Sequence, residues 1–338
     1  MPKTVIGFVL VDAPHSALNN AGQDQGARTE NAIVVKVIRK GRSVYPYVSA
    51  QAWRFWWRRA LEEKFGWNMS PIVREAKVAF TSANPFTYPD DDLFGYMRAL
   101  KKGEGGTLTR LSPLKTSPLV SVFDHAPTND FGVMARQAEG DPVPYEHQFY
   151  STILKGIFSL DLDAVGVFGK TAKTGYKNLD DAYVKTEEIK KAIKAENAQE
   201  NNGYWVLPRS ARVKRAKEAI AALAHIYSTT KGAEHLTDVT PKFVILAVLD
   251  GGNHIFMNIT NENLEKPINA DALRQVVTDY KDLILSDIYI GRQDGFIEAC
   301  KEELEGLVKD LAEIKTIHLL SPKQAIEAFA ASLEKHIE

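Results

Sequence analysis

The hydrophobic pattern of the chain alternates between short strand-like runs and longer helical stripes. Residues 4–11 (TVIGFVLV) are apolar and rich in β-branched side chains, which predicts a buried strand. Apolar residues alternate with other residues over 32–48, on both sides of Lys40-Gly41, which predicts a β-hairpin. Further strands are expected over 156–169, 242–249 and 254–259.

The stretch 49–66 is the clearest helix in the pattern. Ser49 is a suitable N-cap, and Gly66 is a suitable residue to end the helix. Apolar residues recur between them at the spacing of one helical face: Trp53, Trp56, Trp57, Ala60 and Leu61. For the tryptophans this spacing favours core packing over base stacking. More helical segments are expected within 180–203, 209–227, 269–283, 294–313 and 322–336.

Three segments lack a regular period. They are a polar loop at 13–31, an irregular excursion at 84–130, and a basic loop with a charged helical insertion at 170–205. Strands and helices alternate without an internal repeat, and no Gly-rich dinucleotide-binding turn follows the first strand. The pattern therefore predicts one α+β domain over 1–338, a ferredoxin-like sheet with helices on one face and long insertions.

Composition and charge narrow the function classes. No apolar run reaches the roughly 18 residues of a membrane span, and the single cysteine, Cys300, excludes an internal disulfide framework. We therefore expect a cytoplasmic protein. The net charge is −1, but residues 1–136 hold 18 Lys and Arg against 12 Asp and Glu, and the remainder holds 24 against 31. The N-terminal part can therefore present a basic face to phosphates.

Patterns that would indicate catalysis are weak. Residues 164–171 (AVGVFGKT) resemble a relaxed phosphate-binding loop, but Val165, Val167 and Phe168 crowd it, which favours a strand end. The histidines lack metal-ligand spacing. The three acids at 90–92 project in different directions, which favours a solvated face. Because no G-x-S-x-G motif occurs either, we expect no enzyme, cofactor or metal site.

Basic and amide side chains gather in the first 136 residues. Arg54, Arg58 and Arg59 lie on the expected helix, whose N-terminal N–H groups can contact phosphate. The polar loop adds amide side chains and glycines. The excursion adds basic residues: Arg98, Lys101, Lys102, Arg110 and Lys115. Together these features predict a surface that binds the backbone of RNA.

Several short blocks of sequence follow one another in a distinctive order. They are Leu18-Asn19-Asn20, Gly41, YVSAQAWR at 47–54, Arg58 and LKTSPL at 114–119. This order resembles the N-terminal signature of CRISPR effector backbone subunits, the Cas-seven proteins of Cascade-type complexes. Two segments, SALNNAGQDQGARTEN at 16–31 and PYVSAQ at 46–51, are most similar to the DevR-type branch found in type I-B systems.

The resemblance implies an RRM-like palm with a thumb, here residues 84–130. It also implies that copies of the chain and other Cascade subunits assemble on one guide crRNA, which then pairs with target DNA, and that the chain itself is not catalytic. The positions matching the family's RNA contacts are Asn19, Asn20, Ser49, Gln51, Arg54 and Arg58. Other basic residues expected at the RNA are Arg28, Arg39, Lys101, Lys102, Arg110, Lys115, Lys170 and Lys173. Such a subunit contacts the phosphates of the guide and leaves the base edges free to pair with the target.

Two other hypotheses belong to different function classes. Related backbone subunits of type III complexes cut target RNA with a loop aspartate, and Asp24 lies in the corresponding loop here. The chain would then be a metal-dependent nuclease. The DevR label also suggests an autoregulator that binds its own promoter, although no helix-turn-helix pattern occurs in the sequence.

Overall fold

The computed structural model describes residues 1–23, 32–75, 78–99, 107–134, 142–170, 176–228 and 236–338. Its strands are β1 (Lys3–Ser16), β2 (Asn20–Gln23), β3 (Ala32–Val35), β4 (Val37–Lys40), β5 (Ser43–Val48), β6 (Ile72–Glu75), β7 (Val78–Thr81), β8 (Tyr96–Ala99), β9 (Thr107–Arg110), β10 (Leu114–Thr116), β11 (Leu119–Ser121), β12 (Thr128–Met134), β13 (Val143–Asp161), β14 (Val167–Gly169), β15 (Gln199–Asn201), β16 (Tyr204–Val206), β17 (Phe243–Asp250), β18 (Ile288–Arg292) and β19 (Ile317–Leu320). Its α-helices are α1 (Ala50–Phe65), α2 (Pro89–Phe94), α3 (Asp181–Val184), α4 (Glu187–Ala195), α5 (Arg209–Ala221), α6 (Ala270–Asp279), α7 (Lys301–Asp310) and α8 (Pro322–Ser332). Short 3-10 turns lie at Ala222–His225, Glu298–Cys300 and Leu333–His336.

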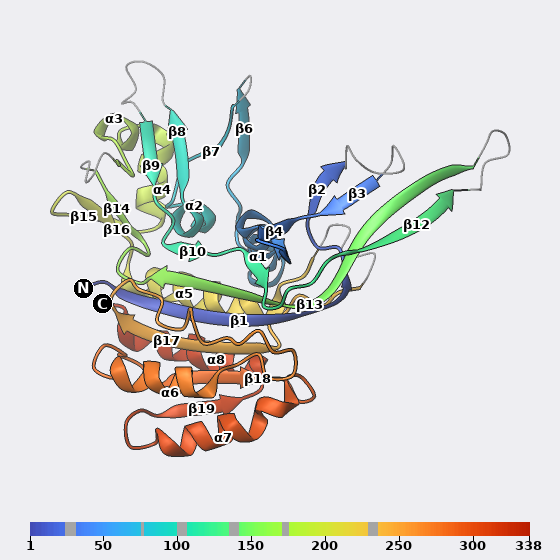
Figure 1. Cartoon of the computed structure of the whole chain (residues 1–338). Coiled ribbons are helices and arrows are strands. Elements are labelled where there is room, and N and C mark those ends of the chain that lie inside the picture. Colours follow the sequence, from blue (N-terminus) through green and yellow to red (C-terminus); the bar gives the residue numbers. More distant parts are fainter. Residues whose placement is uncertain (24–31, 76–77, 100–106, 135–141, 171–175, 229–235) are drawn as a thin grey trace.

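One large mixed sheet organises the fold. Its strand order is β19-β18-β17-β1-β13-β11-β5-β4, so β4 and β19 are its two edges. The apolar strand β1 lies near the middle, antiparallel to both β13 and β17, whereas β18 and β19 run parallel. Figure 1 shows β13 continuing beyond this sheet as a long ribbon with β12.

Side chains alternate between the two faces of this sheet, and each face has its own core. Val5 and Val9 of β1 pack in the core that contains α1, α5 and α8. Ile6 and Phe8 point the other way, into the core that contains α6 and α7. The fold is therefore α+β as expected, but helices cover both faces of the sheet instead of one. Both layers are needed because residues 5–11 of β1 form an uninterrupted apolar run with side chains on both faces.

A side module packs beside the sheet around a third core. We use this name for β8, β9, β14–β16, α3 and α4, which enclose the third core, together with α2, whose Leu93 and Phe94 pack in the core that contains α1. The rings of Phe86 and Phe168 meet edge to face there, with centroids 5.0 Å apart. Segments expected to be two separate insertions, within 84–130 and 170–205, thus share one hydrophobic core. The strands β10 and β11, also inside 84–130, instead pair with β13 in the large sheet.

Local patterns predicted some elements better than others. Helix α1 is confirmed, with Ser49 as its N-cap and Gly66 in the left-handed conformation at its end. The expected hairpin is formed by β4 and β5, whereas β3 pairs with β2 and β13 instead. The strand expected over 254–259 is wrong, because this segment forms turns. None of the described helices is long and apolar enough to cross a membrane.

Candidate nucleic-acid interface

A basic hairpin lies at the β4 edge of the sheet. We call it the edge hairpin, residues 36–48. It contains Lys36, Arg39, Lys40 and Arg42 and no acidic residue. None of these four side chains forms an ion pair with a described residue, and all but Lys36 are exposed. Their charges are therefore available to a polyanion.

The N-terminus of α1 lies directly after the edge hairpin. The hydroxyl of Ser49 caps the helix by accepting a hydrogen bond from the Ala52 N–H at 3.3 Å. The Asn19 side chain accepts a hydrogen bond from the Ser49 N–H at 2.8 Å, and the Asn19 carbonyl accepts one from the Lys36 N–H at 3.0 Å. Asn19 thus fixes the helix start against the hairpin, and Gln51 in the first turn of α1 is exposed.

Asn20 and Ser49 are less available than Gln51. Asn20 opens β2 opposite Val35, and both Asn20 and Ser49 are half-buried. Their positions in the edge-hairpin region agree with the order of blocks in the sequence, but the side-chain atoms of Asn19 and Ser49 are used in contacts within the chain. Asn19 and Ser49 therefore stabilise the position of the edge hairpin and α1, and their bonded side-chain atoms are not available to RNA.

Arg54 and Arg58 point away from the edge hairpin, toward the side module. The Arg54 guanidinium donates to the carbonyls of Phe94 at 2.7 Å and Leu114 at 3.2 Å and to the Ser112 hydroxyl at 3.0 Å. The Arg58 guanidinium lies 4.1 Å from the centroid of the Phe94 ring. Burial lowers the pKa of Arg54 to about 10, with a further contribution from Arg58. Both arginines therefore tie α1 to α2.

Arg110 is buried rather than part of a basic surface, which corrects its expected place. Its guanidinium forms an ion pair with Asp92 and donates to the carbonyls of Ala164 at 2.7 Å and Val167 at 2.9 Å. The Asp92 carboxylate also forms an ion pair with Arg215 of α5 at 2.8 Å. This buried Arg–Asp–Arg triad joins the side module to the helices that cover the sheet.

The run Asp90-Asp91-Asp92 is likewise buried, so the expected solvated face is wrong. Their exposed fractions are 5%, 1% and 0%. The backbone N–H of Ser70 donates to Asp90 at 2.9 Å, and that of Asn84 donates to Asp91 at 2.9 Å. The three acids open helix α2, where backbone N–H groups and distant arginines compensate the burial of charge.

The ionisation of Asp90 makes stability depend on pH. Burial, and then the neighbouring Asp91 charge, raise the pKa of Asp90 from 3.8 to about 6. The folded state therefore holds this proton more tightly than the unfolded state, and the charged form costs stability above about pH 6. Asp90→Asn keeps an acceptor for Ser70, so we expect a higher melting temperature at pH 7.5 and a smaller gain on lowering the pH to 5.

Thermal unfolding at both pH values measures this effect. Asp90→Asn can raise the free energy of unfolding at pH 7.5 by at most about 3 kcal/mol. The pKa of Asp90 rises from 3.8 to about 6, and one pKa unit corresponds to about 1.4 kcal/mol. Asp282→Asn, at an exposed carboxylate, is the control and should change neither melting temperature. An equal loss of stability by Asp90→Asn at both pH values would contradict the assignment.

The remaining expected RNA contacts are scattered. Lys115 is exposed on β10, opposite Ser159, on the sheet face away from α1. Lys170 lies between β14 and the loop before α3, where it forms ion pairs with Asp181 at 3.2 Å and Glu200 at 2.5 Å. Outside the described residues lie Asp24, Arg28, Lys101, Lys102 and Lys173.

Lys36, Lys40 and Arg42 were missed as individual site residues. Their signal is visible in the sequence: a 13-residue hairpin with four cations and no acid. Only the strand order shows its importance, because β4 is an edge strand and its side chains have no further strand beside them.

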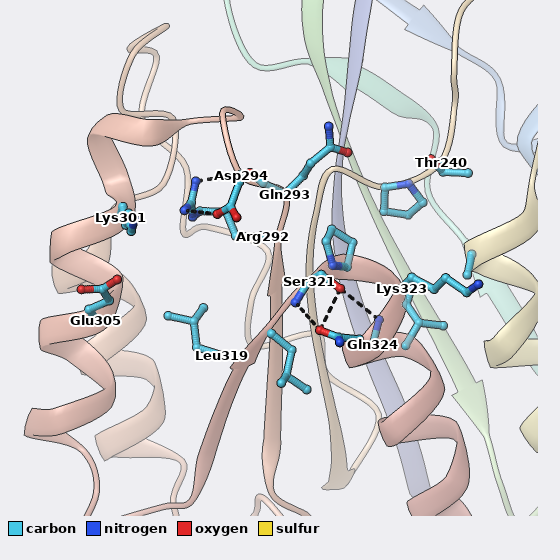
Figure 2. A pocket seen from close by; sticks show the side chains of 15 residues that line it. Thr240, Arg292, Gln293, Asp294, Lys301, Glu305, Leu319, Ser321, Lys323 and Gln324 are labelled. Atoms are coloured by element: carbon cyan, nitrogen blue, oxygen red, sulfur yellow. Dashed lines mark hydrogen bonds and ion pairs between the residues drawn. The ribbon is translucent and has the colours of Figure 1, made fainter.

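A pocket of about 650 Å³ lies at the other edge of the sheet, where β18 and β19 end at the start of α8. Figure 2 shows Arg292 and Lys323 among its lining residues. These cations are already paired, Arg292 with Asp294 and Glu298 and Lys323 with Glu327. The pocket therefore lacks the unpaired charge that distinguishes the edge hairpin.

Among the described residues, no group of three or more His, Cys, Asp or Glu is placed to hold a metal ion.

Comparison with known proteins identifies the family. The sequence profile of the family described as "CRISPR-associated negative auto-regulator DevR/Csa2" matches residues 9–266. The chain belongs to the DevR/Csa2 family. The match includes the edge hairpin, α1, the side module and most of the large sheet. No individually curated protein matches the sequence.

The DevR/Csa2 fold also occurs in solved structures. One similar chain belongs to a "CRISPR RNA-guided surveillance complex", with a TM-score of 0.54 and 13% sequence identity, covering 97% of this chain and 99% of that one. Another belongs to a "CRISPR RNA-guided surveillance complex, pre-nicking", with a TM-score of 0.53 and 12% identity over the same shares. The similarity extends through α6, α7 and α8, beyond the family match.

Proposed function

We propose that this chain is a non-catalytic backbone subunit that binds guide crRNA and oligomerises along it in a Cascade-type complex. The observation that carries the proposal is the edge hairpin, with its four unpaired cations beside the N-terminus of α1, in a DevR/Csa2 chain. Contacts to phosphates would hold any guide sequence and leave its bases free to pair with target DNA. In this proposal the sheet with its packed helices is the RRM-like palm, and other Cascade subunits flank the oligomer.

Purification of the full chain from cells that express a CRISPR array tests this role. We expect RNA to copurify with the protein and nuclease treatment to leave evenly spaced protected segments, because identical copies would cover equal lengths of guide. Affinity should fall steeply with salt concentration, since phosphate contacts release counterions. Protein free of RNA that binds no guide in the purified state would contradict the proposal.

A second candidate follows from the family description, which includes the words "negative auto-regulator". In that case the cations of the edge hairpin would contact duplex DNA. Gel shifts of the purified chain with guide RNA and with its own promoter duplex separate the two, since a preference for the duplex favours the regulator. RNA cleavage through Asp24 stays a prediction from the sequence, because this residue lies outside the described part of the chain.

A further inference from the structure

A row of side chains crosses the large sheet on the face away from α1. The Tyr47 N–H donates to the Lys36 carbonyl at 3.0 Å, which places Lys36 beside Tyr47. Tyr47 lies opposite Val120 of β11, and Val120 lies opposite Lys155 of β13. The row therefore reads Lys36, Tyr47, Val120, Lys155, with a lysine at each end. We call it the tyrosine row.

The orientation of the tyrosine row follows from strand alternation. Val48, Leu119 and Leu154 are the next residues along their strands, and all three are buried in the core that contains α1. Because adjacent residues of a strand point to opposite faces, Tyr47, Val120 and Lys155 point away from that core. Tyr45 lies two residues before Tyr47 and points the same way.

This part of the sheet face is open at the β4 edge. Helices α6 and α7 pack over β1, β17 and β18, and the segment before α6 reaches as far as Tyr45, whose hydroxyl donates to Glu262 at 3.1 Å. Beyond this contact Ile38, which is opposite Tyr45, has an exposed fraction of 41%. Tyr45 and Tyr47 are half-buried, so both residues remain partly accessible to solvent.

Within the described part of the chain, Lys155 has no anionic partner. There its ammonium group donates to neutral acceptors, the Met257 carbonyl and the Thr260 hydroxyl, both at 3.3 Å. Burial lowers the pKa of Lys155, and no described carboxylate forms an ion pair with it. A partly buried cation without a counter-charge is unfavourable unless an anion joins it. Lys36, at the other end of the row, is also without an ion pair.

We propose that the tyrosine row binds an unpaired nucleic-acid strand, with a base stacked on Tyr47 and phosphates bound by Lys36 and Lys155. The two lysines are three strands apart, about 14 Å at a spacing of about 4.8 Å per strand. A strand lying across the sheet would thus meet a cation on each side of the ring. Stacking on an aromatic ring accepts any base and needs an unpaired one.

This inference rests on the proposed role in nucleic-acid binding and adds a second contact to it. Arg39 of the edge hairpin and the α1 N-terminus would hold phosphates of the guide on one face of the sheet. The tyrosine row, which includes Lys36 and Tyr47 of the same hairpin, recognises unpaired bases on the other face. RNA and single-stranded DNA share this chemistry, so the experiment includes both.

Binding of short oligonucleotides to the full chain tests the tyrosine row. The probes are a 12-nucleotide RNA containing 2-aminopurine, the same sequence as DNA, and an abasic strand of equal length. The variants are Tyr47→Leu, which removes the ring, Tyr47→Trp, which keeps a stacking surface, and Lys155→Gln. Tyr280→Leu is the matched control, because Tyr280 is 41% exposed at the end of α6, outside the row.

We expect the wild-type chain to quench 2-aminopurine in at least one of the two strands. Tyr47→Leu should weaken binding of that strand about 5- to 150-fold, the range for losing one base–aromatic stack of about 1–3 kcal/mol. It should not change binding of the abasic strand, and Tyr47→Trp should restore affinity. Lys155→Gln should weaken both strands, because its loss removes a phosphate contact.

Equal effects of Tyr47→Leu on base-containing and abasic strands, or effects no larger than those of Tyr280→Leu, would overturn the inference. If the wild type binds RNA through the edge hairpin and Tyr47→Leu has no effect, only the tyrosine row fails. If the wild type binds no strand, the proposed function fails as well. The wild-type measurement tests stacking even if a variant does not fold. If the wild-type chain binds the probe without quenching 2-aminopurine, the base is not stacked on Tyr47.

Discussion

Replacing Asp92 with alanine is expected to cost about 3–5 kcal/mol of folding free energy, the range for breaking a buried ion pair by removing one partner. The Asp92 carboxylate is fully buried and forms ion pairs with both Arg110 and Arg215, and it also accepts a hydrogen bond from the Gly166 N–H at 3.0 Å. Its loss leaves two guanidiniums buried without a counter-charge. Thermal unfolding should show a fall in melting temperature of roughly 4–7 °C, at an unfolding entropy of about 2.1 cal/mol/K per residue.

A matched control separates this effect from loss of any ion pair. Asp310 pairs with Arg274 at 2.9 Å, but both side chains are exposed. Asp310→Ala should therefore cost no more than about 1 kcal/mol. Because the triad joins the side module to α5, limited proteolysis of Asp92→Ala should cut the side module first. An unchanged melting temperature would show that Asp92 does not hold the module in place.

Reversing the charge of Arg39, Lys40 and Arg42 together should weaken binding of guide RNA by at least about 100-fold at moderate salt, since each lost phosphate contact also loses counterion release. The slope of log affinity against log salt concentration should fall by about 2, at about 0.7 per phosphate of a single strand. Fluorescence anisotropy over a salt series measures both. Folding should be unaffected, because the three side chains are exposed.

The control is a second triple reversal with the same change in net charge. Lys281, Lys309 and Lys323 are exposed and lie outside the edge hairpin, after α6, on α7 and on α8 respectively. Their replacement by glutamate should leave both the affinity and the salt slope nearly unchanged. If the two triple variants lose equal affinity, binding follows overall charge and the edge hairpin is not the site.

The arginines of α1 are poor targets for the same experiment. Arg54 and Arg58 were expected at the RNA, yet their guanidinium groups contact Phe94, and Arg54 also donates to Leu114 and Ser112. Charge reversal at either position would place a carboxylate against backbone carbonyls and an aromatic ring. Loss of RNA binding by such variants would therefore report a displaced side module, so the exposed residues of the edge hairpin give a clearer test.

The two proposed contacts lie on different faces of one sheet. The edge hairpin contributes to both, because Arg39 alternates with Lys36 and Lys40 along β4. A subunit built in this way can hold a guide by its phosphates and still recognise an unpaired base elsewhere. This arrangement explains how a chain with a net charge of −1 can present a strongly basic edge.

Elements whose stability is local could be predicted from the sequence. Helix α1 has its cap, its apolar stripe and its final glycine within 18 residues, and β1 is apolar along most of its length. The order of short blocks also indicated the DevR/Csa2 family, which the comparison confirms. These features could be predicted without the tertiary structure, because the residues that produce them are close together in the sequence.

Only the tertiary structure decided which charges are available. Asp92 and Arg215 are 123 residues apart in the chain, and Arg110 looks no different in sequence from an exposed Lys115. Burial turned the acidic run and three of the arginines into internal contacts, whereas the edge position of β4 left its cations unpaired. The sequence thus determined locally stabilised elements such as α1 and β1, and it indicated the family. Which charges can meet a phosphate depended on contacts between distant segments, because a charge becomes unavailable only when another part of the chain covers and pairs it.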